Sequence, residues 1–406
     1  MIGDSAQGFL PKAGAYTGMV IMDILTTIFW ISSFWIAYVF FGYPILLRVL
    51  SSIAPKRVKV QDDFCPSVSM IIAAYNEEAV IRRKLEETLE TDYPLDKLEV
   101  LVVTDGSTDG TDAIVREFEE RGITLVDHPE NRGKSTAVND AVAQAKHDIL
   151  VFSDASGIYN PEAIGSLVRN FSDPEVGCVS GKVIYSKEHD ATSKGFGLYQ
   201  KFVVNLRQSE NLVGSQTSVS GSIHALRREL YYKVPGHQTA DLMQAVHTVL
   251  NGFRGVYEAK ATSIEEPRTD NSSEFTSRVR IGVRCLSGMG DILSGLTRKK
   301  RFSYLFQIIS HKFGRWWLWL PLLALFISSG LFVAETGSLE SIFGLAFAGQ
   351  SLFYILGILG LLTGKRRVGI PGLSQIAYFL LGNAAMAWAA LRWMSGQRVS
   401  RWTPIR

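Results

Sequence analysis

Apolar residues gather at the two ends of this chain and leave a polar middle between them. Residues 19–50 form one apolar run, with a single charge, Asp23, before Arg48. Three more apolar runs follow residue 315, and they lie at 316–334, 342–362 and 370–393. A helix of about 20 apolar residues crosses a bilayer. We therefore expect a water-soluble unit that is attached to membrane-spanning helices at both of its ends.

Charged residues beside the apolar runs predict the orientation of the chain. Lys56, Arg57 and Lys59 follow the first run, and a second basic segment at 365–367 separates the last two runs. Because basic loops tend to stay in the cytosol, the N-terminus is expected outside and the polar middle inside. This pattern predicts a multi-pass protein of the cell inner (plasma) membrane with its polar middle domain in the cytosol.

The last apolar run, 370–393, creates a conflict with this rule. We expect four crossings, but a fourth crossing would put the basic tail at 395–406 on the outside. The run contains Pro371 and Gly372, so the alternative is that it bends back without crossing.

The charge balance and the cysteines exclude two classes of function. The net charge is only +3, from 42 Lys and Arg against 39 Asp and Glu. A general nucleic-acid binder needs a concentrated basic face, so no nucleic-acid partner is expected. Cys65, Cys178 and Cys285 lie far apart and show no Cys-x-x-Cys or Cys/His spacing, which supports neither a disulfide framework nor a zinc site.

The polar middle, residues 66–270, alternates between short apolar segments and charged helical ones. Strands are expected at 66–74, 98–104, 123–127 and 149–153, and helices at 77–90, 111–121 and 134–145. Such alternation predicts an α/β fold with a mostly parallel, Rossmann-like sheet and helices on both faces. In this architecture ligands bind at the carboxyl ends of the strands.

Two acidic turns follow the first two expected strands. Tyr75-Asn-Glu77-Glu comes after the first strand, and Asp105-Gly-Ser-Thr-Asp-Gly after the second. For either turn alone, ordinary helix capping by Asn, Asp and Ser is an equally good interpretation. Two such turns in register favour a ligand site, where a carboxylate can bind a base N–H or ribose hydroxyls and Gly106 admits a ligand close to the backbone.

Two further residues suit a diphosphate and a metal ion. Lys134, in Asn131-Arg-Gly-Lys, opens the helix at 134–145, where its ammonium group and the helix dipole both favour negative charge. A solvated basic turn is the alternative, and the spacing of a Walker P-loop is absent. Asp154 ends the fourth strand and suits a hard divalent cation shared with a diphosphate, although a structural cap is also possible there.

Taken in order, these four motifs resemble those of the family 2 glycosyltransferases, which have the GT-A fold. The resemblance covers roughly residues 66–290, and the flanking spans resemble the membrane-bound branch that includes chitin-oligosaccharide, hyaluronan and poly-N-acetylglucosamine synthases. It implies that Asp154 belongs to an Asp-x-Asp motif that holds Mg2+ or Mn2+. It also implies a set of donor-binding residues, namely Tyr75, Glu77, Asp105, Lys134, Asp154 and Arg280.

Later motifs resemble the acceptor side of the same family. Gly221 and Ser222 match its small-residue acceptor loop, although a tight turn explains them equally well. Asp241 matches the general base of its Glu-Asp motif, with Ala240 in place of the Glu. Inverting transfer needs one carboxylate to take the proton of the acceptor hydroxyl. A cap at the start of a helix is the alternative for Asp241.

Besides Ala240, three positions depart from the family pattern. Ser156 replaces the second acid of Asp-x-Asp, which makes metal dependence less secure. Ser277 and Ile281 replace the Gln and Trp of the Gln-x-x-Arg-Trp motif around Arg280, which puts processive synthesis in doubt. The arginines of this stretch either face the donor diphosphate or form the basic edge of an amphipathic surface helix at 275–293.

The expected function is inverting transfer of a sugar from a nucleotide-sugar donor, a UDP-sugar, to a lipid-linked or growing glycan acceptor. The expected partners are this donor, that acceptor and membrane lipid. A processive polysaccharide synthase and a catalytically decayed membrane nucleotide sensor are the alternatives. The expected units are a membrane helix at 19–50, a GT-A domain at 66–270, amphipathic interfacial helices at 271–313, membrane helices at 314–394 and a basic tail at 395–406.

Overall fold

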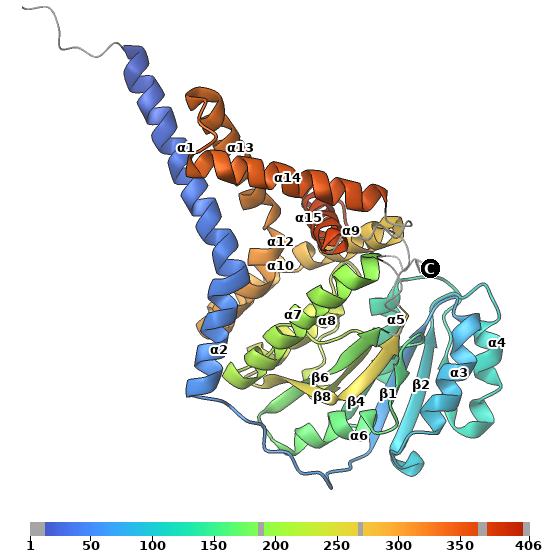
Figure 1. The fold of residues 1–406 in the computed structure, drawn as a ribbon. Coiled ribbons are helices and arrows are strands. Elements are labelled where there is room, and N and C mark those ends of the chain that lie inside the picture. The colour runs from blue at the N-terminus through green and yellow to red at the C-terminus, as the bar shows by residue number, and fades with distance from the viewer. Residues whose placement is uncertain (1–12, 186–190, 267–270, 364–371, 401–406) are drawn as a thin grey trace, which may run out of the picture.

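A mixed eight-stranded sheet forms the centre of the molecule (Figure 1). The computed structural model describes residues 13–185, 191–266, 271–363 and 372–400. The order of the strands in the sheet is β3-β2-β1-β4-β7-β6-β8-β5. The strands are β1 Val68–Ala74, β2 Leu98–Thr104, β3 Ile123–Val126, β4 Ile149–Asp154, β5 Ile158–Tyr159, β6 Val176–Tyr185, β7 Ile223–Arg227 and β8 Arg254–Glu265.

The first half of the sheet is parallel, as the sequence predicts. β1 pairs in parallel with both β2 and β4, and β2 pairs in parallel with β3. Every residue of β1 is buried, which explains why its sequence is continuously apolar rather than alternating. The second half is mixed, because β7 runs antiparallel to β4 and β6 while β8 runs parallel to β6.

Helices cover both faces of the sheet and give it two hydrophobic clusters. On one face, α3, α4 and α6 pack on alternate residues of β1 such as Met70 and Ile72. On the other face, α5 and α8 pack on Ile71 and Ala73. The helices of this unit are α3 Glu78–Leu89, η2 Leu95–Lys97, α4 Thr111–Arg116, η3 Glu119–Arg121, α5 Lys134–Gln144, α6 Ala163–Val168, η4 Arg169–Ser172, α7 Ala191–Val213, η5 Arg228–Leu230 and α8 Ala240–Leu250.

The helices after β8 belong to the same packed unit as the sheet. These are α9 Asn271–Ser287, α10 Met289–Arg298, α11 Phe302–Ile308, η6 Ile309–Phe313 and α12 Gly314–Trp316. Leu242 and Val246 of α8 share one cluster with Ile292 of α10 and Tyr304 of α11. Helices on both sides of the expected boundary at residue 270 thus share this cluster, and the division of the chain into units stays a prediction. The expected helix at 275–293 is two helices that meet at Gly288.

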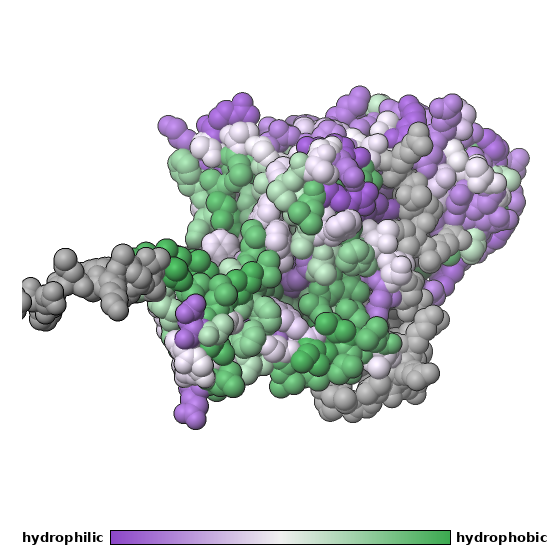
Figure 2. Space-filling view, turned by 90° about the horizontal axis from the view of Figure 1, so that it is seen from above, coloured by the Kyte–Doolittle hydropathy of each residue, from purple (hydrophilic) through white to green (hydrophobic). Residues whose placement is uncertain are grey.

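By length and composition, three of the described segments are able to cross a membrane. They are Met19–Ile53, Trp319–Thr336 and Ile342–Leu362. The first combines α1 Ala13–Ala37, η1 Tyr38–Gly42 and α2 Tyr43–Ile53, and the others are α13 Trp319–Thr336 and α14 Ile342–Leu362. Large apolar side chains on these helices are exposed, and Figure 2 shows a broad apolar surface on the face seen from above. Such a surface suits lipid rather than water.

The fourth expected crossing is not supported by the structure. The helix concerned, α15 Leu373–Met394, does not qualify as a candidate span among the described residues. Its Ala385 and Ala389 pack on Val279 and Val283 of α9. Just after its end, Ser400 lies against Gly236 of the sheet unit. The described part of the tail therefore lies against the sheet unit, and the side of the membrane on which the tail lies stays a prediction.

Candidate active site

The turns after β1 and β2 hold each other at the carboxyl edge of the sheet. Asn76 has a φ of 53°, a left-handed conformation that Asn tolerates. Its Oδ1 accepts a hydrogen bond from the backbone N–H of Thr108 at 2.7 Å, and the N–H of Glu77 donates to Oγ1 of Thr111 at 2.8 Å. Tyr75 and Glu77 lie half-buried at this edge. Their contact with a nucleotide remains a prediction.

Asp105 is completely buried and holds the turn that carries the basic motif. Its carboxylate accepts hydrogen bonds from the backbone N–H groups of Arg132 at 2.9 Å and Gly133 at 2.7 Å. These bonds fix the N-terminus of α5, where Lys134 begins the helix. Here Asp105 acts as a support for the turn, and its predicted direct contact with the donor remains untested.

Lys134 and Asp154 form an ion pair across the gap between α5 and the end of β4. Both side chains remain about one-third exposed, at 31% and 30%. Burial alone would lower the pKa of Lys134, but the neighbouring Asp154 carboxylate makes the net shift upward. Lys134 is therefore a fixed positive charge at a helix N-terminus, in the arrangement that binds phosphate. Ser156, two residues after Asp154 in the sequence, is exposed.

Asp241 lies in the first turn of α8 and faces the small-residue loop. α8 begins at Ala240 with Thr239 as its N-cap, so Asp241 is not itself the cap. Burial raises the pKa of the Asp241 carboxyl, Lys134 lowers it and Asp154 raises it, with a net upward shift. Asp241 is thus electrostatically coupled to the Lys134–Asp154 pair, as expected for the base and the donor site of one centre.

Gly221 is in direct contact with this carboxylate. A Cβ atom at Gly221 would lie 2.9 Å and 3.1 Å from the two carboxylate oxygens of Asp241. The loop is also bound to α8, because the N–H of Val219 donates to the carbonyl of Asp241 at 2.9 Å. Ser222 is buried. The position of Asp241 therefore requires a glycine at 221, and the acceptor contact of Gly221 and Ser222 remains a prediction.

We expect Gly221→Ala to lower transfer activity by at least about ten-fold, because the new methyl group must displace the Asp241 carboxylate and a shift of about 1 Å is costly in catalysis. The matched control is Gly214→Ala, since a Cβ at Gly214 would meet no atom within 4 Å. Initial rates and thermal unfolding of both variants check this. Equal activity of the two variants would show that the placement of Asp241 does not depend on Gly221.

Two arginines of α9, Arg278 and Arg284, lie in different surroundings. Arg284 reaches the site, where its Nη2 donates to Oγ of Ser135 at 2.8 Å and to the carbonyl of Gln238 at 2.7 Å. Arg278 instead pairs with Glu274 at 2.7 Å and lies over the ring of Tyr378 in α15. The second contact places Arg278 against α15.

Arg280, the arginine that the motif match selected, is half-buried on α9 between these two residues. Its predicted role in donor binding is neither supported nor opposed by a described contact. Arg284 is four residues further along the same helix, and Asp241 is the first of the charges that act on its pKa after burial. Arg284 is therefore the arginine of α9 whose described contacts, with Ser135 and Gln238, lie beside the start of α5 and near Asp241.

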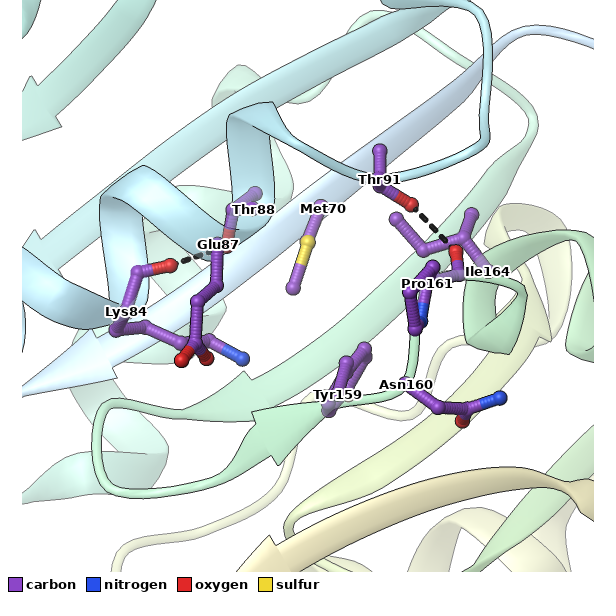
Figure 3. Close-up of a pocket in the computed structure, with 9 residues that line it drawn as sticks. All are labelled: Met70, Lys84, Glu87, Thr88, Thr91, Tyr159, Asn160, Pro161 and Ile164. Atoms are coloured by element: carbon purple, nitrogen blue, oxygen red, sulfur yellow. Dashed lines mark hydrogen bonds between the residues drawn. The ribbon is translucent and has the colours of Figure 1, made fainter.

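The sequence gives no signal that Lys84 is functional, because its pattern is that of a surface lysine on a charged helix. The structure buries it on α3, and its Nζ donates to the carbonyl of Gly157 at 2.5 Å. The Nζ atom also lies 4.0 Å from the ring centre of Tyr159 (Figure 3). Burial lowers the pKa of Lys84 to about 7. Lys84 supports the loop from Asp154 to Gly157 from behind and so positions Asp154.

A divalent metal fits this site only together with a ligand that brings its own oxygen atoms. Among the described residues, no group of three or more His, Cys, Asp or Glu is placed to hold a metal ion. Asp154 is a partly exposed carboxylate at the strand end, and Ser156 is exposed two residues later. Oxygen atoms of a diphosphate would have to complete the coordination shell.

The comparisons with known proteins find a family model, curated relatives and solved structures that are similar to this chain. The family model described as Glycosyl transferase family 2 matches residues 69–234. The poly-beta-1,6-N-acetyl-D-glucosamine synthase of Staphylococcus aureus (strain COL) is 27% identical over 214 residues, 51% of this chain and 51% of that protein. The synthase of the same name from Staphylococcus epidermidis is 26% identical over 189 residues, 46% of this chain and 45% of that protein. The chain thus spans about half the length of these curated relatives.

A solved structure resembles the chain over nearly its whole length. It is a mannosyltransferase of Pyrobaculum calidifontis in complex with GDP-Man and Mn2+, with a TM-score of 0.68 and 23% sequence identity. The match covers 93% of this chain and 99% of that one. At this identity the likeness shows the fold alone.

Proposed function

We propose that this chain, which carries a family 2 glycosyltransferase domain of GT-A fold over residues 69–234, transfers a sugar from a nucleotide-sugar donor to an acceptor at the cytosolic face of the membrane. One observation carries the proposal: the carboxylate of Asp241 is coupled to the Lys134–Asp154 pair at the carboxyl edge of the sheet. A carboxylate with a raised pKa beside a phosphate-binding lysine supplies both halves of a sugar-transfer site.

The proposed reaction is a single displacement with inversion at the anomeric carbon. Asp241 takes the proton of an acceptor hydroxyl, the acceptor oxygen forms a bond to the anomeric carbon, and the bond from that carbon to the donor diphosphate breaks. Lys134 and the N-terminus of α5 stabilise the negative charge that grows on the leaving diphosphate. Arg284 lies within electrostatic reach of Asp241 and orients the start of α5 through Ser135.

We further propose that Mg2+ or Mn2+ accompanies the donor. Asp154 would hold the ion together with the diphosphate, and the ion would neutralise part of the charge on the leaving group. The mannosyltransferase of similar fold was solved with Mn2+ and GDP-Man. The ion pair between Lys134 and Asp154 would then loosen, because the lysine and the metal ion compete for the carboxylate of Asp154.

We propose that the donor is a UDP-sugar. The proposed acceptor is either a lipid-linked molecule or a growing glycan. The similarity to poly-N-acetylglucosamine synthases supports an N-acetylglucosamine donor, whereas the fold neighbour was solved with GDP-Man. A screen of UDP- and GDP-sugars with the purified full chain in detergent, which measures nucleotide release, tests the function. Failure of every nucleotide-sugar would favour the decayed sensor instead.

We expect that one or very few sugars are added per acceptor rather than a long polymer. At the positions of the polymer-forming motif, Ser277 is completely buried and Ile281 is an exposed aliphatic side chain. A polymerase has to hold the terminal ring of its product while the donor is exchanged, and an aromatic face does this better than isoleucine.

A reaction with limiting acceptor and excess donor, resolved by mass, checks this expectation. Single additions spread over all acceptor molecules are the expected result. Long products formed while most acceptor remains unused would indicate a processive synthase.

A further inference from the structure

Four buried polar side chains from four different parts of the chain meet at the loop that leads to Gly221. Glu210 belongs to α7, Tyr43 to α2 and His311 to η6, while Thr217 belongs to the loop that follows α7. The exposed fraction of each of these residues is 0% or 1%. We call these four residues the Glu210 network.

The carboxylate of Glu210 is the centre of this network. It accepts hydrogen bonds from the hydroxyl of Tyr43 at 2.9 Å and from both Oγ1 and the backbone N–H of Thr217, at 3.2 Å and 3.3 Å. Nδ1 of His311 lies 2.7 Å from the carboxylate and 2.9 Å from Oγ1 of Thr217. A buried carboxylate is costly unless such partners surround it. These contacts therefore fix the position of Glu210 and, with it, that of Thr217.

Thr217 begins a stretch of backbone that soon contacts Asp241. Two residues after Thr217, the N–H of Val219 donates to the carbonyl of Asp241 at 2.9 Å. Two residues further, a Cβ atom at Gly221 would lie 2.9 Å and 3.1 Å from the carboxylate oxygens of Asp241. Glu210 is thus connected to the proposed catalytic base through one short loop.

This loop is held from two sides. On the side of the sheet, the N–H of Gln216 donates to the carbonyl of Gly255 in β8 at 2.9 Å. On the side of η6, Nζ of Lys312 donates to Oγ of Ser218 at 2.7 Å, next to the bonds that Thr217 makes with the Glu210 network. Anchors on both sides give the loop one defined position, which a catalytic carboxylate in contact with it requires.

Tyr43 connects the loop to the first segment that is able to cross a membrane, Met19–Ile53. Its part of this segment, α2, packs on α7 (Figure 1). A second tyrosine of the same segment, Tyr38, has its hydroxyl 2.7 Å from Oγ of Ser310. Both hydroxyl groups therefore bind a neighbouring helix, but the described contact that leads to Glu210 belongs to Tyr43.

We propose that Glu210 is a positioning residue for sugar transfer, which acts through Thr217 on the Asp241 carboxylate. It holds Thr217 in place, and the loop after Thr217 then keeps Asp241 in its place beside Gly221. The hydroxyl of Tyr43 makes the first membrane segment part of the same hold. The effect on Asp241 rests on the proposed function, whereas the hold of the Glu210 network on the loop does not.

The test uses variants that remove single hydroxyl groups, so that the buried carboxylate itself stays in place. Thr217→Val and Tyr43→Phe each take one hydrogen bond from Glu210 and keep nearly the same side-chain shape. Tyr38→Phe is the matched control, because it removes a hydroxyl of the same membrane segment whose partner is Ser310. Thr217→Ser keeps the hydroxyl and serves as the conservative rescue.

Two kinds of measurement are made on the purified full chain in detergent. Hydrogen–deuterium exchange follows the amide groups of residues 215–222, and it does not depend on any reaction. Steady-state kinetics give kcat and the donor KM, and equilibrium dialysis gives the stoichiometry of donor binding per chain. This stoichiometry falls if a variant has merely lost folded protein.

We expect Thr217→Val and Tyr43→Phe to raise the exchange rate of the loop amides about ten-fold and to lower kcat about ten-fold, since a shift of about 1 Å at the base is costly. The donor KM and the stoichiometry of donor binding should not change, because Lys134 and Asp154 are untouched. Tyr38→Phe should leave the exchange and kcat unchanged, and Thr217→Ser should recover most of both effects.

Unchanged exchange in both Thr217→Val and Tyr43→Phe would overturn the hold on the loop. Faster exchange with unchanged kcat would overturn the effect on Asp241, and so would a fall in kcat that a lower stoichiometry of donor binding fully explains. An equal effect of Tyr38→Phe would also overturn the proposal. If the unchanged protein turns over no nucleotide-sugar, the proposed function fails, and faster exchange in the two variants would still establish the hold on the loop.

Discussion

Asp241→Asn is expected to lower the rate of sugar transfer by about 10²–10⁴-fold, the usual contribution of a general base. An amide occupies nearly the same space as the carboxylate but cannot accept the proton of the acceptor hydroxyl. The dissociation constant of the donor should change little, because Lys134 and Asp154 remain in place. Single-turnover rates and donor binding, measured on the same preparation, check both parts of this expectation.

The pH dependence gives an independent check on the role of Asp241. Burial and the neighbouring Asp154 raise the pKa of the Asp241 carboxyl against the opposite effect of Lys134. A base must be deprotonated to act, so activity should fall as the pH drops through this raised pKa, at a higher pH than for an ordinary carboxyl group. Asp241→Asn should lose this acidic limb, and Asp96→Asn, at an exposed position of η2, should retain it. Activity of Asp241→Asn within a few-fold of the unchanged protein would place the base elsewhere.

Asp154→Ala is expected to remove most activity, by about 10²-fold or more, because the metal ion and its share of the leaving-group charge are lost together. The effect has a second cause, since Lys134 loses its ion-pair partner. Ser156→Asp should be tolerated or should lower the metal concentration that gives half-maximal activity, because a second carboxylate adds a hard oxygen ligand. Titration with Mg2+ and Mn2+ measures both effects.

The exposed carboxylate Glu162, replaced in Glu162→Gln, is the matched control for Asp154. This variant should keep both its activity and its metal requirement. Full activity of the unchanged protein in excess EDTA, after thorough removal of metal, would contradict the role given to Asp154. Activity without metal would leave Lys134 as the main source of positive charge at the leaving group.

Much of the candidate site was predictable because its residues follow strands whose type is visible locally. The runs at 66–74 and 149–153 are short, apolar and rich in branched residues, and the turns after them are acidic. Once the strands are parallel, their carboxyl ends meet at one edge. Tyr75, Asp105 and Asp154 could therefore be assigned to one site before any contact was known. The family resemblance added Asp241, which the spacing of the sequence does not connect to them.

Other parts of the site have no local signal. Lys84 follows the pattern of a charged helix, and only the packing of α3 on the sheet shows that its ammonium group holds the carbonyl of Gly157. On α9, motif matching selected Arg280, whereas the contacts with Ser135 and Gln238 belong to Arg284. The sequence does not define the rotation of a helix about its axis finely enough to choose between two arginines one turn apart.

By itself, the sequence determined the properties that depend on neighbouring residues: the apolar lengths that suit a bilayer, the parallel half of the sheet, and the polar turns at its edge. The tertiary structure decided what depends on distant partners. In the tertiary structure α15 packs on α9, and Ser400 lies against Gly236 of the sheet unit. These contacts do not support the predicted fourth crossing. The tertiary structure also brought Nζ of Lys312 within 2.7 Å of Oγ of Ser218, directly before the loop that contacts Asp241. The reason is physical: periodicity reports burial and secondary structure within one segment, whereas contacts between segments depend on the packing of the whole chain.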